Sequence, residues 1–327
     1  GDDARGEYIY KFVSQNLWQA KDANADDRLA VGDKYLNTGT LFVAKFKEDG
    51  TGDWIELSMN NPLIAAYTGF KFETNADIAI FTRLAADAVG ATKMDRPEWG
   101  GVNPKNGEIY ITLTNNSQRQ VSNLDAANPR SYTDTKGSKE QKGNVHGHIV
   151  RLAQTQPAAK DFKWDIYLFA SEADADKSLI NLSSLTDDND LSSPDGLVFS
   201  PSTGICWIQT DDGAYTDKTN CMMLAAIPGK LGDGGARQLN YGDKVVTTQV
   251  GKNPSPDTLK RFLVGPKGAE ITGICETPDG RALFINIQHP GENTKLADVN
   301  DSKRYESLWP SNAGYGNGQR PRSATIV

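Results

Sequence analysis

A hairpin-like sequence frame recurs three times in the chain and constrains its fold more than any other feature. The copies read RPEWGGVNPKNGEIYITLTNN (96–116), DGLVFSPSTGICWIQTDDG (195–213) and TGICETPDGRALFINIQHP (272–290). In each copy a proline and then a glycine separate two segments in which apolar and polar residues alternate. Turn residues between two period-2 segments predict a β-hairpin. Three hairpins of one pattern indicate a repeat architecture.

A polar residue opens the first strand of each hairpin, where an apolar one would be expected. Glu98 and Asp195 stand six residues before the proline, and Glu270 precedes the third copy by two residues. In a β-propeller the innermost strand of each blade runs along the central channel, and blades are arranged radially. We therefore expect an all-β propeller in which these three acids meet at the mouth of the channel.

The rest of the chain is predicted to consist of further strands, long polar loops and one helix. An inserted helix is expected near residues 75–90, within NADIAIFTRLAADAVGAT (75–92), with Thr74 and Asp77 as a capping box. Loops are expected at 117–143 and elsewhere. No linker separates two compositions, so residues 1–327 are assigned to one domain. The three frames account for only part of a ring, which predicts an incomplete propeller.

Composition and charge narrow the possible partners. The net charge is −7 and no basic stripe is present, so nucleic acid is not expected as a partner. No apolar run approaches the roughly 20 residues of a membrane span, so no membrane contact is expected. Cys206, Cys221 and Cys275 lack metal-ligand spacing and are predicted to be buried apolar residues.

Three carboxylates that meet without partners would raise one another's pKa until some were protonated. A cation removes this conflict, and a set of oxygen ligands suits calcium. The alternative is that each acid caps its own turn or pairs with a nearby Lys or Arg. For the set, the metal site is the preferred interpretation.

Several segments together resemble PhoX-type alkaline phosphatases, in order and over nearly the whole chain. They are GDDARGEYIYKFVS, ATKMDRPEWGGVNPKNGEIYITLTNN, GHIVRL, SPDGLVFSPSTGICWIQTDDG, EITGICETPDGRALFINIQHPGE and RPRSATIV. The resemblance implies a β-propeller phosphomonoesterase that acts on a phosphate monoester. It also implies an iron–calcium cluster in the channel and a periplasmic or secreted location.

The resemblance also implies roles for individual residues. Arg96, in DRPEW, is expected to grip phosphate and stabilise the transition state as the catalytic group. Glu98, Asp195 and Glu270 are expected to be metal ligands, and Glu7, in GEYIYKF, is the fourth.

Other positions carry less direct implications. Asn144 and His148, in NVHGHI, are expected near the substrate, and His146 stands where the family usually has Tyr. The cysteine segment that supplies the family's iron ligand does not occur in this sequence. The chain is therefore expected to be the C-terminal part of a longer protein. Its partner would be a missing N-terminal half, as an extension or a nicked chain.

Alternatives stay open for both residues and function. The TDDG stretch (210–213) resembles part of a calcium loop but is also common turn chemistry. His289 is taken as structural rather than as a ligand. Arg83 and Lys93 are taken as solvated charges. The competing functions are a calcium-dependent lactonase-like propeller enzyme and a non-catalytic propeller scaffold.

Overall fold

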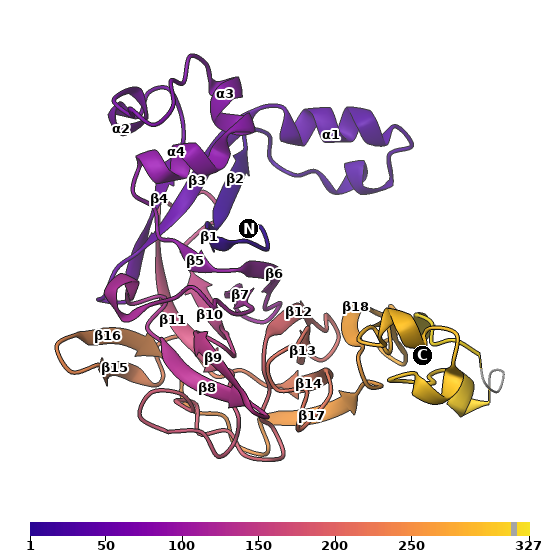
Figure 1. Ribbon diagram of the computed structural model, residues 1–327. Coiled ribbons are helices and arrows are strands. Elements are labelled where there is room, and N and C mark those ends of the chain that lie inside the picture. The colour runs from indigo at the N-terminus through magenta and orange to yellow at the C-terminus, as the bar shows by residue number, and fades with distance from the viewer. Residues whose placement is uncertain (315–318) are drawn as a thin grey trace.

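The three predicted hairpins form the framework of the computed structural model, which describes residues 1–314 and 319–327 (Figure 1). Their strands are β6 (Pro97–Val102) with β7 (Ile109–Leu113), β12 (Pro194–Phe199) with β13 (Cys206–Thr210), and β18 (Glu270–Glu276) with β19 (Leu283–Gln288). Each pair is antiparallel. The turn glycines Gly107, Gly204 and Gly280 have φ of 75°, 74° and 67°, a left-handed conformation that glycine adopts without strain.

Each hairpin begins an antiparallel sheet, which we call a blade. The strand orders are β6–β7–β10–β11 in the first blade, β12–β13–β14–β17 in the second and β18–β19–β20 in the third. The added strands are β10 (His148–Ala153), β11 (Asp161–Phe169), β14 (Met222–Ala226), β17 (Leu259–Val264) and β20 (Ala324–Ile326). Strand β12 contacts both β6 and β18, so the inner strands of successive blades are neighbours. The all-β, propeller-like fold is confirmed, and Figure 1 shows the blades curling around part of a circle.

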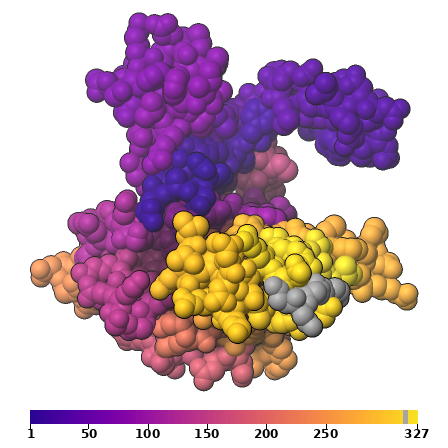
Figure 2. Space-filling view, turned by 45° about the vertical axis from the view of Figure 1, so that its right-hand side comes forward, coloured from indigo at the N-terminus to yellow at the C-terminus, as the bar shows by residue number. Residues whose placement is uncertain are grey.

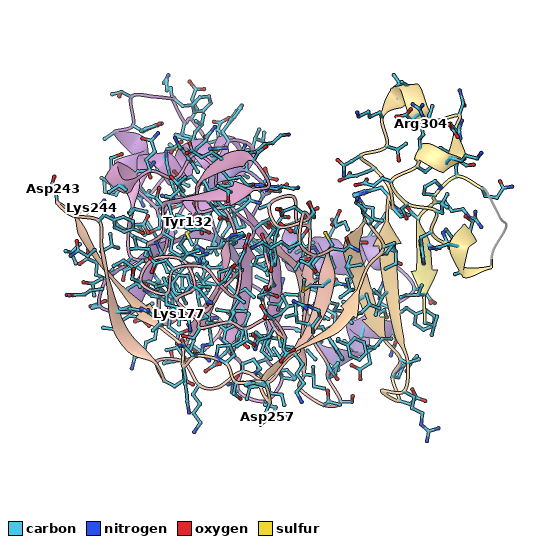
Figure 3. All side chains as sticks on the ribbon, turned by 60° about the horizontal axis from the view of Figure 1, so that its bottom comes forward. Tyr132, Lys177, Asp243, Lys244, Asp257 and Arg304 are labelled. Carbon is cyan, nitrogen blue, oxygen red and sulfur yellow. The ribbon has the colours of Figure 1, made fainter. Side chains whose placement is uncertain are left out.

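The first blade is extended at its outer edge into a nine-stranded sheet. Strand β11 also pairs with β4 and β16. The added strands are β2 (Tyr10–Ser14), β3 (Gly39–Phe46), β4 (Thr51–Glu56), β15 (Gly235–Asn240) and β16 (Val245–Val250). Asp243 and Lys244, labelled in Figure 3, lie in the turn between β15 and β16 at the edge of the molecule.

Two hairpins were not predicted. One is β15–β16, and the other is β8 (Tyr132–Lys136) with β9 (Lys139–Gly143), which lies inside the predicted loop 117–143. The β9 sequence KEQKG contains no apolar residue, so no alternation marks it as a strand. Strand β1 (Arg5–Glu7) pairs with β5 (Met94–Asp95) and places the start of the chain beside β6.

The predicted helix at 75–90 is present but is divided into two segments. The helices are α1 (Arg28–Leu36), α2 (Pro62–Ala65), α3 (Asn75–Ile80) and α4 (Thr82–Ala88), and the 3-10 helices are η1 (Ala20–Asn24), η2 (Val121–Asn123), η3 (Leu296–Asp298), η4 (Ser302–Arg304) and η5 (Ser311–Ala313). Phe81 separates α3 from α4 with ψ of 44°. The Thr74–Asp77 capping box is confirmed. Figure 2 shows α1 and the group α2–α4 as two projections from the body of sheets.

None of the helices in the described part of the chain is long and apolar enough to cross a membrane.

Apolar side chains fill the spaces between neighbouring blades. Tyr110 and Ile149 of the first blade pack with Leu197 and Ile208 of the second. Trp207, Met223, Ile271 and Ile285 join the second blade to the third. Burial of one such side chain contributes about 1.5–3 kcal/mol, so these layers hold the blades at fixed positions around the axis.

A β-bulge lies at the same frame position of each inner strand. The pairing register shifts between Pro97 and Gly100, between Pro194 and Leu197, and between Thr272 and Ile274. A bulge adds a residue on one strand and redirects neighbouring side chains. Glu98 and Asp195 therefore stand within the irregular part of their strands, and Glu270 stands two residues before it.

A hydrogen bond of one pattern links each inner hairpin to the next blade. Thr112 Oγ1 donates to the carbonyl oxygen of Asp195 at 2.7 Å. Gln209 Nε2 donates to the carbonyl oxygen of Thr272. Thr112 and Gln209 each lie 14 residues after the opener of their own frame, Glu98 and Asp195. The repeat thus connects the second strand of one blade to the inner strand of the next, at the residue six positions before the frame proline.

We expect Thr112→Val to lower the free energy of unfolding by about 1 kcal/mol, because two partly buried backbone groups lose their partner. These are the carbonyl of Asp195 and the N–H of Trp99, which donates to Thr112 Oγ1 at 3.0 Å. Urea denaturation measures the change. The matched control is Thr247→Val on β16, whose hydroxyl forms no hydrogen bond within the described residues. Equal midpoints for the two variants would contradict the proposed importance of the link.

Candidate metal and phosphate site

The acids that open the three inner strands converge, as the frame predicts. Oxygens of Asp195, Asp211 and Glu270 all lie within 4.8 Å of one another. Glu98 joins them, because its carboxyl shares a hydrogen bond with Asp3 and is close enough to Asp195 to feel its charge. We call Asp3, Glu98, Asp195, Asp211 and Glu270 the acid group.

The carboxyls of the acid group perturb one another strongly. Burial, the hydrogen bond to Asp3 and the charge of Asp195 raise the pKa of Glu98 to about 9. Burial and the charge of Asp211 raise the pKa of Asp195 to about 6. Burial and the charges of Asp211 and Asp195 raise the pKa of Glu270 to about 7. Without a cation the fully ionised group is therefore unfavourable, and a bound cation would relieve it.

Arg96 is held between the acid group and the first hairpin. It connects β5 to β6 with φ of 54°, an uncommon conformation for a residue other than glycine. Its Nε and Nη2 donate to the two carboxylate oxygens of Asp3 at 2.5 and 2.8 Å, and Nη1 donates to Asn115 Oδ1 at 3.0 Å. Nη2 also lies 3.9 Å from Glu98 Oε1. The guanidinium therefore presents a planar fork that already holds a two-oxygen anion.

Asp211, His289 and Asp3 belong to the site, although the frame analysis did not assign them. His289 Nε2 lies 3.5 Å from Glu270 Oε2, and its Nδ1 lies 3.2 Å from Glu292 Oε2. Asp211 directly follows β13, and His289 directly follows β19; each of these strands is the second strand of its hairpin. In an antiparallel hairpin the end of the second strand lies beside the start of the first strand: Thr210 pairs with Pro194, the neighbour of Asp195. This geometry is a signal present in the sequence, because Asp211 lies in TDDG and His289 lies at the end of the third copy.

Glu7 lies apart from the acid group. It is buried, and its Oε1 accepts from the backbone N–H of Tyr8 at 2.9 Å and from Tyr10 Oη at 2.8 Å. Its Oε2 lies 3.4 Å from Arg83 Nη1. Arg83 is thus an ion-pair partner rather than a purely solvated charge, and Glu7 is occupied by structural contacts. The structure does not bring it to the predicted metal site.

Asn144 and His148 are also placed elsewhere, in a fully buried polar network. Asn144 Nδ2 donates to Asp95 Oδ2 at 3.0 Å and contacts His148 Nδ1 at 3.0 Å. His148 Nε2 lies 2.8 Å from the carbonyl oxygen of Ala127. Burial lowers the pKa of His148 to about 4, which keeps the ring neutral. These side chains support Asp95, the neighbour of Arg96, and do not reach the acid group.

The cysteines do not contribute to the acid group. Cys206 and Cys221 are buried as predicted, whereas the prediction was wrong for Cys275, which is exposed. Cys275 lies on β18, and its Sγ is directed to the carbonyl of Glu276 at 3.8 Å. Cys221 Sγ accepts from the N–H of Asp212 at 3.1 Å, and burial raises its pKa to about 12. A protonated thiol is a poor metal ligand. The donor set is therefore made of carboxylate oxygens, which suit a hard cation.

Comparisons with known proteins identify the family of the chain. The family described as Alkaline phosphatase PhoX matches residues 1–291. A solved structure, Pseudomonas fluorescens PhoX in complex with vanadate, a transition state analogue, is 32% identical with a TM-score of 0.70. The match covers 99% of this chain and 49% of that chain, so this chain spans about half the length of that protein. No curated protein matches the chain.

The family match does not support the prediction that this chain is a C-terminal part whose partner is a missing N-terminal half. The match begins at residue 1 and continues through residue 291, and the structural alignment covers nearly the whole chain. The extent of both matches shows that the chain belongs to the PhoX alkaline phosphatase family.

Proposed function

We propose that the chain is a calcium-dependent phosphomonoesterase whose site is the acid group together with Arg96. The observation that carries the proposal is the juxtaposition of clustered carboxylates with an arginine fork that holds a two-oxygen anion. Phosphate offers the same fork two oxygens with more negative charge than a carboxylate. The vanadate complex of the related PhoX supports a substrate of this class.

Glu98, Asp195, Asp211 and Glu270 would hold calcium, and Asp3 lies beside them. The bound cation would supply positive charge that stabilises the equatorial oxygens of the phosphoryl group. Asn115 fixes Nη1 of Arg96, so that the other two donors face outward without a loss of side-chain freedom upon binding. In this role Arg96 orients the ester and stabilises the negative charge of its transition state. The phosphate would replace the carboxylate of Asp3 as the acceptor of the hydrogen bonds from Nε and Nη2.

Iron, which the resemblance implies, would find no cysteine donor in the acid group. A periplasmic or secreted location is part of the proposal, on the basis of family membership alone.

The proposal is tested with the full chain, calcium and p-nitrophenyl phosphate. Hydrolysis that requires calcium and is inhibited by vanadate is expected. Calcium binding without hydrolysis would favour the non-catalytic scaffold. Hydrolysis of a lactone but not of the phosphate ester would favour the lactonase-like alternative.

Asp195→Asn should change stability in opposite directions with and without calcium. Two unit charges 4.8 Å apart repel by about 3 kcal/mol at an effective dielectric constant of about 20, so removal of one charge should raise the melting temperature of the calcium-free chain. Calcium at 100 times its Kd stabilises a single-site protein by about 2.7 kcal/mol, and the variant should lose most of this gain. Thermal unfolding measures both effects.

The control for this experiment is Asp53→Asn on β4, whose carboxylate pairs with Lys47 at 2.7 Å. Its response to calcium should equal that of the unaltered chain. If Asp195→Asn retains the full stabilisation by calcium, Asp195 is not a ligand.

Arg96→Ala should lower turnover of the phosphate ester by about 100-fold or more, because a donor to the transition state is lost. Arg96→Lys should recover little, because lysine lacks the planar fork. Stabilisation by calcium should persist in both variants, since arginine is not a ligand. Steady-state kinetics and thermal unfolding provide the two measurements.

Arg83→Ala is the matched control, because Arg83 is also partly exposed and ion-paired but contacts Glu7. It should keep normal turnover. Full activity in Arg96→Ala would exclude the proposed role of the fork.

A further inference from the structure

A second group of potential ligands lies outside the acid group, around His146. Ligand atoms of Asp134, His146 and Glu172 all lie within 4.8 Å of one another. Asp134 is on β8, His146 is in the connection from β9 to β10, and Glu172 follows β11. Three segments distant in sequence thus deliver one imidazole and two carboxylates to one place.

We propose that Asp134, His146 and Glu172 form a binding site for a divalent transition-metal ion of the zinc type, distinct from the acid group. Zinc is bound by imidazole nitrogen and carboxylate oxygen and commonly uses three protein ligands with an open fourth position. Calcium, in contrast, takes oxygen ligands only. The imidazole within the ligand set therefore favours a zinc-type ion over calcium at this place.

Glu172 provides the observation that points to a ligand. The residue is 5% exposed, and its Oε1 is buried and has no hydrogen-bond partner among the residues that the structure describes. Its Oε2 is engaged by Lys218 Nζ. An unpaired buried carboxylate oxygen is unfavourable, and its pairing to an ion removes this cost. Glu172 can bind a metal through Oε1 while Lys218 keeps Oε2.

His146 is held in the manner of a metal-binding histidine. Its Nδ1 lies 2.9 Å from Ser192 Oγ, and its Nε2 lies 2.7 Å from Asp134 Oδ2. Histidine ligands usually donate their second ring N–H to a nearby oxygen, which fixes the tautomer. With Nε2 on the metal, the ring proton resides on Nδ1 and is donated to Ser192.

The surroundings keep the ring in place and leave an entrance. The ring of Tyr132 stacks on His146 with centroids 6.1 Å apart, and that of Tyr215 meets it edge-on at 6.3 Å. Figure 3 shows Tyr132 within the body of the molecule. Asp134 is the exposed member, with 18% of its side chain accessible. An ion can thus reach the site at Asp134 and be enclosed by the other two ligands.

The small number of histidines allows a direct test by ¹⁵N NMR of the imidazole rings. The chain has three, His146, His148 and His289. With calcium in excess to occupy the acid group, one equivalent of zinc should shift the Nε2 signal of a single ring. That signal should be absent from His146→Gln and unchanged in His289→Gln. His148 is an internal reference, because both of its nitrogens have protein partners.

Two further variants keep the test informative if His146→Gln folds poorly. Asp134→Asn, at the rim of the site, should abolish the shift that zinc causes in the Nε2 signal of His146. Ser192→Ala should weaken zinc binding by about 10–100-fold, as expected for loss of a group that orients a ligand. Stabilisation by calcium should be unaffected in both. The inference is overturned if zinc shifts the ring of His289, shifts none, or binds Asp134→Asn and Ser192→Ala as tightly as the unaltered chain.

Discussion

The hydrogen bond from the second strand of one blade to the opener of the next sets the geometry of the acid group. Thr112 and Gln209 occupy the same frame position and bind the backbone of Asp195 and Thr272. Because the acceptor is a backbone carbonyl of the inner strand, at Asp195 or Thr272, each of these two bonds fixes the inner strand of the neighbouring blade. The side chains of the openers can then differ without a change in the spacing between blades. Charged residues can be brought together because their main chain is held by other contacts.

Apolar burial between blades offsets the unfavourable meeting of the acids. Each inter-blade layer contains several large side chains, and each contributes about 1.5–3 kcal/mol. The repulsion between two partly buried carboxylates is of the same order as one such side chain. The fold therefore tolerates a site that is unfavourable in the absence of a cation. This is the general pattern in which binding sites are less stable than the scaffold that positions them.

The sequence predicted the framework well because the frame encodes local geometry. Turn glycines, alternating strands and the acids Glu98, Asp195 and Glu270 all have a fixed place in the repeat. The polar hairpin β8–β9 has no apolar alternation, so local reasoning assigned it to a loop. Glu7 shows a second limit, since its contacts with Tyr8 and Tyr10 depend on burial that no spacing reveals.

The residues of the site that were hardest to predict lie at the end of the second strand of a hairpin or in another segment of the chain. Asp211 joins the group because antiparallel pairing returns its strand to the opener, and His289 follows β19 in the same way. Asp3 arrives through the pairing of β1 with β5. The buried network of Asn144 and His148 lies one residue from Arg96 along the chain, at Asp95. The resemblance placed Asn144 and His148 near the substrate, whereas in the structure they contact Asp95, the residue that precedes Arg96.

A continuous row of hydrogen bonds joins Arg96 to His146, and its direction is fixed at one end. Arg96 can only donate, so Asn115 accepts through Oδ1 and donates through Nδ2 to Ser193 Oγ at 3.3 Å. Ser193 must then pass its own proton onward. Its two acceptors are Ser192 Oγ at 3.3 Å and Asp212 Oδ1 at 3.4 Å.

Because Ser193 can donate to either Ser192 or Asp212, a change at His146 need not reach Arg96. If Ser192 donates to Nδ1 of His146, Ser193 can donate to Ser192, and every bond in the row points away from Arg96. When a cation takes Nε2, Nδ1 becomes a donor and Ser192 turns toward Ser193. Ser193 then donates to Asp212 instead, and the bond from Asn115 is unchanged. The reversal therefore ends at Ser193, so Arg96 keeps its orientation whether or not the site around His146 is filled.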